Sequence, residues 1–157
     1  MFHVVLYQPE IPPNTGNVIR LCANTGCQLH LIRPLGFAID HAKMRRAGLD
    51  YHEFAKLNVY DDLAGFIEAA KPARLFALST RGRQRYDSMR YAPGDAFVFG
   101  PETRGLPQDL LDGLPATQCL RLPMQPHNRS LNLSNTVAIV VFEAWRQNDF
   151  AGAAATI

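Results

Sequence analysis

The sequence has few residues of the kinds that form disulfides or bind metals. Its three cysteines, Cys22, Cys27 and Cys119, are an odd number and lack the CxxC spacing, which argues against a disulfide framework or a redox motif. We expect them to be buried as small hydrophobic residues. The five histidines show no HExxH or comparable ligand spacing, so the sequence predicts no metal site.

Long hydrophobic runs are missing as well. No apolar stretch approaches the roughly 20 residues that span a bilayer. The first residues, MFHVVLYQPE, contain no basic region followed by a cleavage site and are typical of a first strand. Hydrophobic residues make up 47% of the chain and charged residues 19%, as in globular proteins. We therefore predict a cytoplasmic protein that does not contact membranes.

Several common ligand-binding motifs are also absent. No GxGxxG follows the first predicted strand, which argues against a Rossmann domain that binds a dinucleotide. The motifs GxxxxGK[ST] and GxSxG are missing too, which argues against a P-loop NTPase and an α/β-hydrolase.

What the sequence does contain is an alternation of strand-like and helix-like segments. Strands are predicted at residues 2–7, 28–32, 57–60, 74–79, 96–99 and 119–122, and helices at 17–25, 41–47, 61–70, 107–112 and 133–145. Prolines in the segment 8–16 predict that the first helix does not begin before about Thr15. The alternation predicts a single α/β domain over residues 1–157, with a largely parallel sheet flanked by helices and a frayed tail at 151–157.

Three predicted strands are followed by loops of similar composition. Residues 78–82, 100–105 and 123–132 are rich in Gly, Pro, Ser, Thr and Asn. In parallel sheets the carboxyl ends of the strands lie at one edge, where ligands bind. Ordinary turn formation explains the same residue types, but their recurrence after three strands favours a ligand site.

The last predicted helix has two notable features. Ser130, Asn132 and Ser134 precede it as candidate N-caps, and such a helix start can also hold an anionic ligand, although the local pattern alone favours simple capping. The helix is apolar nearly all round, because one face carries Val137, Val140, Val141, Ala144 and Trp145 and the other Ala138, Ile139 and Phe142. A helix of this kind must be buried on several sides, so we predict that it forms a dimer interface.

The basic residues are clustered, although the formal net charge is only +2. One cluster contains Lys43, Arg45 and Arg46, and the other Arg81, Arg83, Arg85 and Arg90. Scattered basic residues usually form only a solvated face, whereas clusters beside a ligand site indicate an anionic partner.

Three separated segments together resemble the motifs of the SPOUT class of RNA methyltransferases. They are NTGNVIR at 14–20, FGPETRGL at 99–106, and LPM at 122–124 with RSLNLSN at 129–135. The similarity extends from the first strand to about Gln147. The segments YQPEIPPNTGNVIRLCANTG and MRRAGLDYHE resemble the minimal branch, the tRNA 2′-O-methyltransferases that act on the wobble nucleotide, position 34, of certain leucine tRNAs.

This resemblance implies S-adenosylmethionine as cofactor, bound in a C-terminal trefoil knot, and an obligate homodimer. General topology rules weigh against a knot, and here the resemblance outweighs them. Without an additional RNA-binding domain, the two subunits would bind the anticodon stem-loop together. The RNA phosphates would contact the residues Lys43, Arg45, Arg46, Arg81, Arg83 and Arg85.

The resemblance also implies roles for individual residues. The cofactor would contact Leu78, Thr80, Gly100, Glu102, Leu122, Met124, Ser130, Leu131 and Asn135, and the catalytic residues would be Asn14, Arg20, Glu102, Ser130 and Asn132. Arg20 is a poor base because its guanidinium stays protonated. We expect it to bind the phosphate next to the target ribose and to stabilise developing oxyanion charge, with that phosphate as one candidate acceptor of the proton. The alternatives are a salt bridge of Arg20 at the dimer interface, and a helix-start role for Glu102.

Two features depart from the resemblance: the minimal branch usually has Tyr where this chain has Phe142, and the segment 125–128 differs from the commonest relatives. Two other functions stay open at this point: 2′-O-methylation of another RNA, and a non-catalytic knotted RNA-binding module. The presence of Arg20, Glu102, Ser130 and Asn132 argues against the module. The resemblance does not specify the tRNA isoacceptors, a preference for C or U, a need for prior modification, or the proton acceptor.

Overall fold

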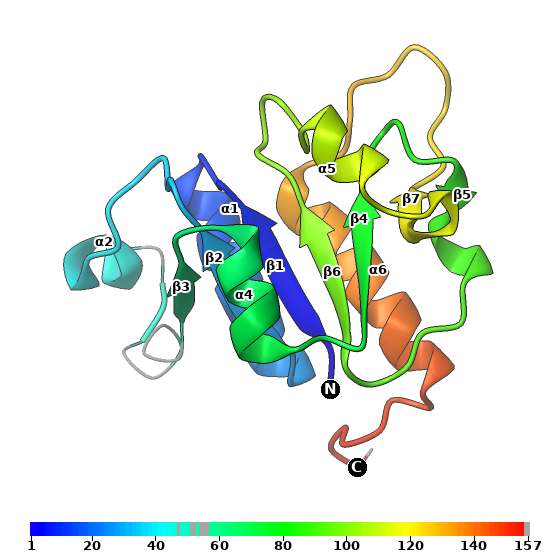
Figure 1. The fold of residues 1–157 in the computed structure, drawn as a ribbon. Helices are drawn as coiled ribbons and strands as arrows, with labels where there is room; N and C mark the ends of the chain where they lie inside the picture. Colours follow the sequence, from blue (N-terminus) through cyan, green and yellow to red (C-terminus); the bar gives the residue numbers. More distant parts are fainter. Residues whose placement is uncertain (47, 51–52, 54–56, 156–157) are drawn as a thin grey trace.

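A seven-stranded sheet in the order β3-β2-β1-β6-β4-β7-β5 forms the centre of the computed structural model (Figure 1). The structure describes residues 1–46, 48–50, 53 and 57–155. Within them, all strand pairings are parallel, which confirms the predicted α/β fold class. The strands are β1 (His3–Tyr7), β2 (Gln28–Ile32), β3 (Asn58–Tyr60), β4 (Arg74–Leu78), β5 (Gln84–Arg85), β6 (Asp95–Phe99) and β7 (Cys119–Arg121).

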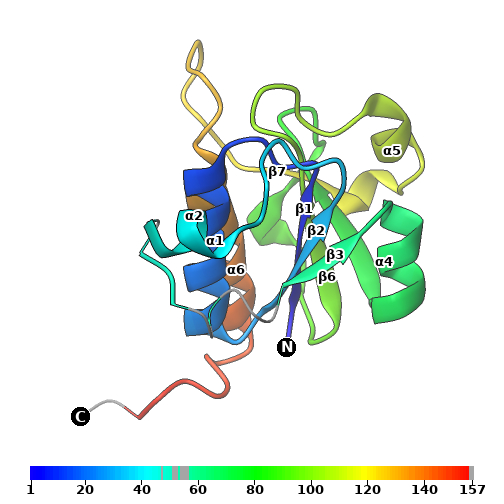
Figure 2. The same cartoon turned by 90° about the vertical axis from the view of Figure 1, so that its left-hand side faces the viewer.

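Helices cover both faces of the sheet (Figure 2). One face packs against α1 and α6, and the other against α4 and α5. The helices are α1 (Pro12–Thr25), α2 (His41–Arg46), α4 (Leu63–Ala70), α5 (Gln108–Asp112) and α6 (Leu133–Gln147), and two 3-10 turns lie at Tyr86–Ser88 and Ala116–Gln118. None of these helices, in the part of the chain that the structure describes, is long and apolar enough to cross a membrane.

The central strands are hydrophobic on both faces because both are covered. In β1, Val4 and Leu6 belong to the core on the α1 and α6 side, whereas Val5 belongs to the core on the α4 and α5 side. The same alternation in β6 places Phe97 on the first side and Val98 on the second. The two cores together hold the strand ends in fixed positions.

Helix α1 begins earlier than the sequence predicted. It starts at Pro12, and its first two residues are Pro12 and Pro13. Proline is tolerated there because the first helical N–H groups have no partner within the helix, and because its fixed φ already suits a helix. The predicted end is correct, since Gly26 has a φ of 77° and its N–H donates to the Cys22 carbonyl.

Strand β5 was predicted as part of a basic loop, and this prediction was wrong. Gln84 and Arg85 pair with Leu120 and Arg121 of β7. A strand of two residues has too little sequence to show alternation. Asp62 caps α4 by accepting the Gly65 N–H at 2.7 Å. The helix predicted at 41–47 is present as the short basic helix α2, although its predicted last residue, Ala47, lies outside the described residues.

The cysteines fit the sequence prediction in part. All three are free thiols, and Cys22 and Cys119 are buried while Cys27 is half-buried. Burial raises the pKa of the Cys22 and Cys119 thiols, so both remain protonated at neutral pH. They therefore act as small hydrophobic residues.

Helix α6 buries only one of its two apolar faces within the chain. Val137, Val140, Val141 and Ala144 are fully buried, whereas Trp145 is only partly covered. Ile139 and Phe142 lie on the other face and are 37% and 45% exposed. Trp145 Nε1 donates to the Ala151 carbonyl at 2.9 Å, so the tail begins attached to α6, and its residues 156–157 lie outside the described residues.

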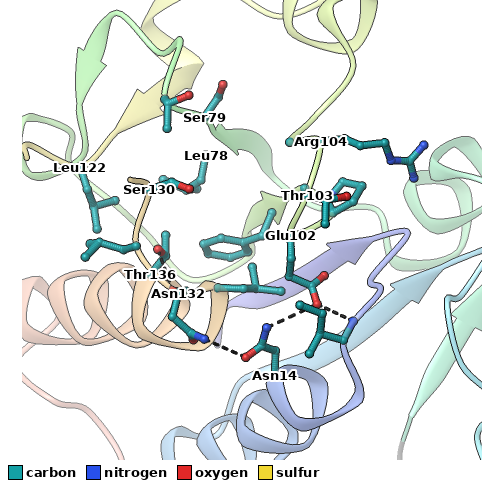
Figure 3. Close-up of a pocket in the computed structure, with 18 of the residues that line it drawn as sticks. Asn14, Leu78, Ser79, Glu102, Thr103, Arg104, Leu122, Ser130, Asn132 and Thr136 are labelled. Carbon is teal, nitrogen blue, oxygen red and sulfur yellow. Dashed lines mark hydrogen bonds between the residues drawn. The ribbon is translucent and has the colours of Figure 1, made fainter. Parts of the chain in front are cut away.

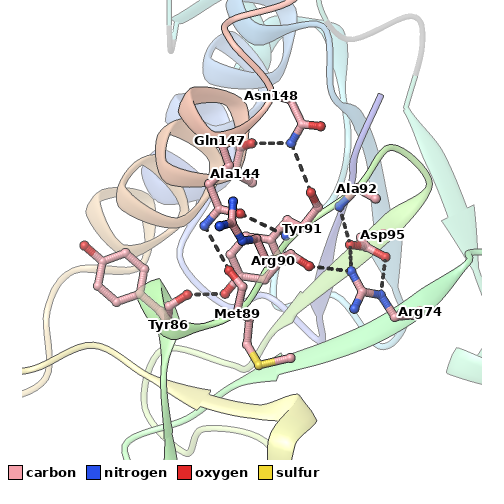
Figure 4. A network of polar contacts seen from close by, with 10 residues as sticks. All are labelled: Arg74, Tyr86, Met89, Arg90, Tyr91, Ala92, Asp95, Ala144, Gln147 and Asn148. Carbon is pink, nitrogen blue, oxygen red and sulfur yellow. Dashed lines mark hydrogen bonds and ion pairs between the residues drawn. The ribbon is translucent and has the colours of Figure 1, made fainter.

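A polar network fastens the connection between β5 and β6 to the end of α6 (Figure 4). Arg74 forms a bidentate pair with the buried Asp95, with N–O distances of 3.0 and 2.7 Å. The Gln147 side chain accepts the Tyr91 N–H and donates to the Met89 carbonyl, both at 2.9 Å. These contacts satisfy backbone groups of the segment and tie it to α6 and to β4.

Candidate active site

A cavity of about 480 Å³ lies at the carboxyl ends of β4, β6 and β7 (Figure 3). Its size suits a small-molecule ligand. The three loops that the sequence indicated all contribute to its wall. The wall contains the predicted residues Asn14, Leu78, Thr80, Arg81, Gly100, Glu102, Leu122, Met124, Ser130, Leu131 and Asn132, and also Ile11, Ser79, Phe99, Pro101, Thr103, Arg104, Gly105, Leu133 and Thr136.

The loop after β6 turns back tightly on itself. A Cβ atom added to Gly100 would lie 2.4 Å from the Leu106 nitrogen and 2.6 Å from the Gly105 carbonyl carbon. Gly105 has a φ of +69°, a conformation that glycine adopts without strain. Both glycines are therefore required by the backbone path, which brings main-chain groups to the cavity wall.

The Glu102 carboxylate points from this loop to the start of α1. It accepts the Glu10 N–H at 2.9 Å and the Ile11 N–H at 2.5 Å. Helix α1 has no capping side chain of its own, since its N-cap residue is Ile11. The sequence offered two roles for Glu102, one in the site and one at a helix start. The structure places it in both positions, because it lines the cavity and also accepts N–H groups at the start of α1.

Two asparagines continue this line of hydrogen bonds across the cavity (Figure 3). The buried Asn14 donates to Glu102 at 3.4 Å and accepts from Asn132 Nδ2 at 2.9 Å. Asn132 is the N-cap of α6, because its Oδ1 accepts the Ser134 N–H at 2.9 Å. The three motifs of the sequence are thus joined through one chain of side chains: Glu102, Asn14 and Asn132.

The rest of the wall separates apolar from polar groups. Leu78 and Phe99 are buried, and Leu122 packs half-buried against the same core. Ser130 is exposed and has no hydrogen-bond partner within the described residues. An apolar floor with free polar groups at the rim suits a ligand with a flat apolar part and a polar part.

Two predicted residues lie outside the cavity. Arg20 lies further along α1, where its guanidinium donates to the Gly48 carbonyl and pairs with Glu53 at 3.3 Å. This ion pair is within one chain. Asn135 lies in the first turn of α6, where its N–H contributes to the Asn132 cap at 3.4 Å.

The predicted RNA-binding residues fall into two groups. Lys43, Arg45 and Arg46 are exposed on α2, at the opposite edge of the sheet from β5 (Figure 1). The other group lies in and just before β5, and of its members only Arg81 lines the cavity. There, Arg81 donates to Gln108 Oε1 at 2.5 Å and to the Leu106 carbonyl, and Arg85 pairs with Asp87 at 2.6 Å, which lowers the Asp87 pKa.

One residue in contact with the site was missed by the sequence analysis. The Glu10 carboxylate accepts the Thr103 N–H at 3.0 Å and the Thr103 hydroxyl at 2.8 Å, and these bonds lower the Glu10 pKa. Each of the two carboxylates, Glu10 and Glu102, therefore accepts hydrogen bonds from the loop that carries the other. No local pattern indicates this contact, because it joins residues 93 positions apart.

Metal-binding chemistry finds no support in the described part of the chain. No three His, Cys, Asp or Glu side chains among those residues are grouped so that they could hold a metal ion. The site instead presents backbone groups, amides, hydroxyls, two guanidinium groups and the engaged carboxylate of Glu102.

The fold and the site together define a class of protein, a parallel α/β domain with a ligand-sized cavity at the carboxyl ends of three strands. The sequence profile of the SpoU rRNA methylase family matches residues 1–142, and the chain therefore belongs to this methyltransferase family. This confirms the expected enzyme class and the resemblance seen in the sequence.

Particular relatives are highly similar over their whole length. The chain is 65% identical to a tRNA (cytidine(34)-2′-O)-methyltransferase of Burkholderia ambifaria, covering 98% of this chain and 100% of the relative. It is 58% identical to the protein of the same name from Escherichia coli K12, covering 98% of both.

Solved structures show the same fold. A putative RNA methyltransferase from Bacillus anthracis superposes with a TM-score of 0.90 at 47% identity over 100% of both chains. A structure concerned with the 2′-OH methylation of C/U34 on tRNA gives a TM-score of 0.86 at 48% identity, over 96% of this chain and 97% of that one.

Proposed function

We propose that this protein transfers a methyl group from S-adenosylmethionine to the ribose 2′-hydroxyl of nucleotide 34 in leucine tRNAs. The observation that carries the proposal is the convergence of three motifs on one cavity, joined by Glu102, Asn14 and Asn132. The names of relatives 65% and 58% identical support the tRNA and the nucleotide.

The residues present fit the proposed methyl donor. The cavity of about 480 Å³ has an apolar floor for a flat base and polar rim groups for the amino-acid part. Gly100 lets the backbone approach closely, since a Cβ there would lie 2.4 Å from the Leu106 nitrogen. S-adenosylmethionine supplies an activated methyl group on its sulfonium, which a hydroxyl oxygen can accept by in-line displacement.

The chain's own residues fix the geometry of that displacement. Both Glu102 oxygens accept N–H groups, so we assign this carboxylate a positioning role and not that of proton acceptor. Through Asn14 it also orients Asn132. The free Ser130 hydroxyl is the group that we propose to orient the ribose hydroxyl. Such positioning is effective because a displacement reaction requires alignment of the reacting atoms.

Arg20 is proposed to bind the phosphate beside the target ribose. Its fixed, planar guanidinium suits a bidentate contact with phosphate and stabilises developing negative charge, and the phosphate takes the hydroxyl proton. The position of Arg20 outside the cavity of its own chain is consistent with a site completed by a second subunit.

The homodimer, the trefoil knot and the cytoplasmic location belong to the same proposal. The exposed apolar side chains of Ile139 and Phe142 on α6 support a subunit interface there. We propose the knot in the region of the loop that leads from β7 to α6. For the RNA, the basic residues Lys43, Arg45, Arg46, Arg81, Arg83 and Arg85 are proposed to hold phosphates of the anticodon stem-loop.

The test is methylation of bulk tRNA from a strain that lacks this activity. Purified protein and S-adenosylmethionine labelled in the methyl group are incubated with the tRNA, and the labelled nucleotide is mapped. We expect label on the ribose of nucleotide 34 in leucine tRNAs. The Arg20→Ala variant should bind the methyl donor normally but lose most of the turnover.

Other outcomes are equally informative. Label on another nucleotide or RNA would contradict the proposed target but not the reaction. Tight binding of donor and tRNA without label, also when tRNA carrying its other modifications is supplied, would favour a non-catalytic RNA-binding module.

A further inference from the structure

The outer edge of the sheet beside the cavity carries closely spaced arginines. Strand β5 is one of the two edge strands and, within the described residues, pairs with β7 alone, at the right of the sheet in Figure 1. In this pairing Arg85 lies directly opposite Arg121. Side chains of paired residues on adjacent strands project from the same face of a sheet, about 4.8 Å apart. Both arginines are exposed, as is Arg83 just before β5.

These charges are poorly neutralised within the chain. Within the described residues, Arg83 and Arg121 have no ion pair or side-chain hydrogen bond, and Arg85 pairs with Asp87. Helix α5 carries two acidic side chains, Asp109 and Asp112, and within the described residues neither forms an ion pair with these arginines. The strip of Arg83, Arg85 and Arg121 therefore keeps an excess of positive charge that faces solvent.

The segment that carries this strip is rigid. The Ser79 N–H donates to the Leu120 carbonyl at 2.9 Å, and a Cβ on Gly82 would lie 2.4 Å from the Leu120 oxygen. The loop is thus pressed against the backbone of β7. Arg81 joins this loop to the start of α5, because its guanidinium donates to Gln108 Oε1 and to the Leu106 carbonyl. The backbone that leads into the strip is therefore held against β7 and the cavity wall.

The strip also adjoins the cavity. Thr80 and Arg81 line the cavity on one side of the strip, and Leu122 and Met124 line it after Arg121. An anionic chain whose reactive group entered the cavity would pass over this edge of the sheet.

Folding does not account for this arrangement. Like charges directly opposite on adjacent strands are destabilising, and the exposed guanidinium groups add little to the core. We infer that Arg83, Arg85 and Arg121 form a phosphate-binding strip that holds the RNA backbone beside the methylation site. Arg121 is the new member, and the contacts of Arg81 with Gln108 and the Leu106 carbonyl hold the loop that leads into the strip. This inference rests on the proposed function.

The experiment measures tRNA affinity over a range of salt concentrations for Arg83→Gln, Arg121→Gln and the double variant. Removing one arginine that binds a phosphate should lower the slope of log affinity against log salt by about 0.7 to 0.9. Binding should weaken several-fold at low salt, with the defect shrinking as salt is raised. Lys71→Gln, which removes one exposed charge at the end of α4, is the matched control and should leave the slope unchanged.

Kinetics and stability separate this role from a structural one. The KM for tRNA should rise in Arg121→Gln, while kcat and affinity for S-adenosylmethionine stay as in the parent. The thermal unfolding temperature should stay unchanged or rise, because a repulsion is removed. An unchanged salt slope in the double variant would overturn the inference. If the Lys71→Gln and Arg121→Gln variants both had smaller slopes than the parent, and by the same amount, the inference would also be overturned. That result would show a diffuse effect of net charge.

The proposed function is tested separately by the parent protein. If the parent methylates nucleotide 34 and Arg121→Gln binds tRNA with an unchanged slope, only the strip is wrong. If the parent methylates no RNA while the strip variants lose RNA affinity as expected, the reaction is wrong and the RNA surface stands. Binding of an acidic protein with tRNA affinity unaffected would identify a different partner and reject the strip.

Discussion

Glu102 accepts the Glu10 and Ile11 N–H groups at the start of α1, a helix whose first two residues are prolines. A local N-cap side chain is typically worth about 1 kcal/mol, and bonds to a charged acceptor are stronger than neutral ones. Here the acceptor comes from a loop about 90 residues away in the chain. One residue therefore ties the helix start to the cavity wall.

At the same scale, His30 is the buried member of a row of hydrogen-bonded rings that also contains His3 and Tyr60. His30 is 2% exposed. Its Nε2 lies 2.9 Å from His3 Nδ1, and its Nδ1 lies 3.1 Å from the Tyr60 hydroxyl. Burial and the neighbouring His3 lower the pKa of His30 to about 4. The ring is therefore neutral in the folded protein at pH values where an exposed histidine is protonated.

This difference predicts how stability depends on pH. Between the ordinary pKa of 6.5 and about 4, the unfolded chain binds a proton at His30 that the folded chain does not, so stability falls as pH falls. The loss is about 1.4 kcal/mol per pH unit for one such group, and about 3 kcal/mol across the window. Denaturant unfolding at several pH values measures it.

The control for this prediction is His30→Gln, which cannot titrate. We expect this variant to be less stable than the parent at neutral pH, because it loses ring contacts, but to have a flatter pH dependence. The carboxylates titrate alike in both proteins, so their contribution to the free energy of unfolding cancels when the two stability curves are subtracted. Parallel stability curves for parent and variant would contradict the assignment.

At the scale of elements, the loop between β6 and α5 sets the shape of the cavity. Gly100→Ala would place a Cβ 2.4 Å from the Leu106 nitrogen, so the loop must shift. Overpacking of this kind typically costs about 1–3 kcal/mol. We expect affinity for S-adenosylmethionine to fall by about tenfold or more, measured by titration calorimetry.

Gly113→Ala is the matched control for Gly100→Ala. Gly113 ends α5, and a Cβ there would lie 3.5 Å from the nearest atoms, which is ordinary contact. This variant should bind the donor as the parent does. If both alanine variants bound it normally, the tight turn at Gly100 would not matter for the ligand.

Elements also differ in how much of them the sequence could predict. The end of α1 was predictable because Gly26 adopts a positive φ that terminates helices. The start was not, because Pro12 and Pro13 are compatible with both a loop and a first helical turn. Strand β5 depends on its pairing with β7, which two residues of sequence do not encode.

At the scale of the whole molecule, α6 leaves an apolar face uncovered. Ile139 is 37% exposed on this helix, and Ile67 is 42% exposed on α4, on the opposite layer. If α6 forms the proposed dimer interface, Ile139→Asp should break the dimer, because a two-fold interface contains the residue twice. Burial of an isoleucine is worth about 1.5–3 kcal/mol, so dimer affinity should fall by about a hundredfold or more.

The matched control is Ile67→Asp, which introduces the same charge at a similarly exposed isoleucine. Sedimentation over a range of concentrations should give a monomer for Ile139→Asp and a dimer for Ile67→Asp and the parent. A dimeric Ile139→Asp protein would place the subunit contact elsewhere. Dissociation by both changes would indicate a general loss of folding.

The sequence by itself determined the parallel α/β class, the three loops of the cavity and the methyltransferase family. Strand periodicity, turn residues and motifs are local properties, and the ends of parallel strands necessarily meet at one edge. Only the tertiary structure decided which side chains touch. The contact of Asn132 with Asn14 spans 118 positions and that of Thr103 with Glu10 spans 93. Such pairs depend on how whole elements pack, and no local interaction specifies them.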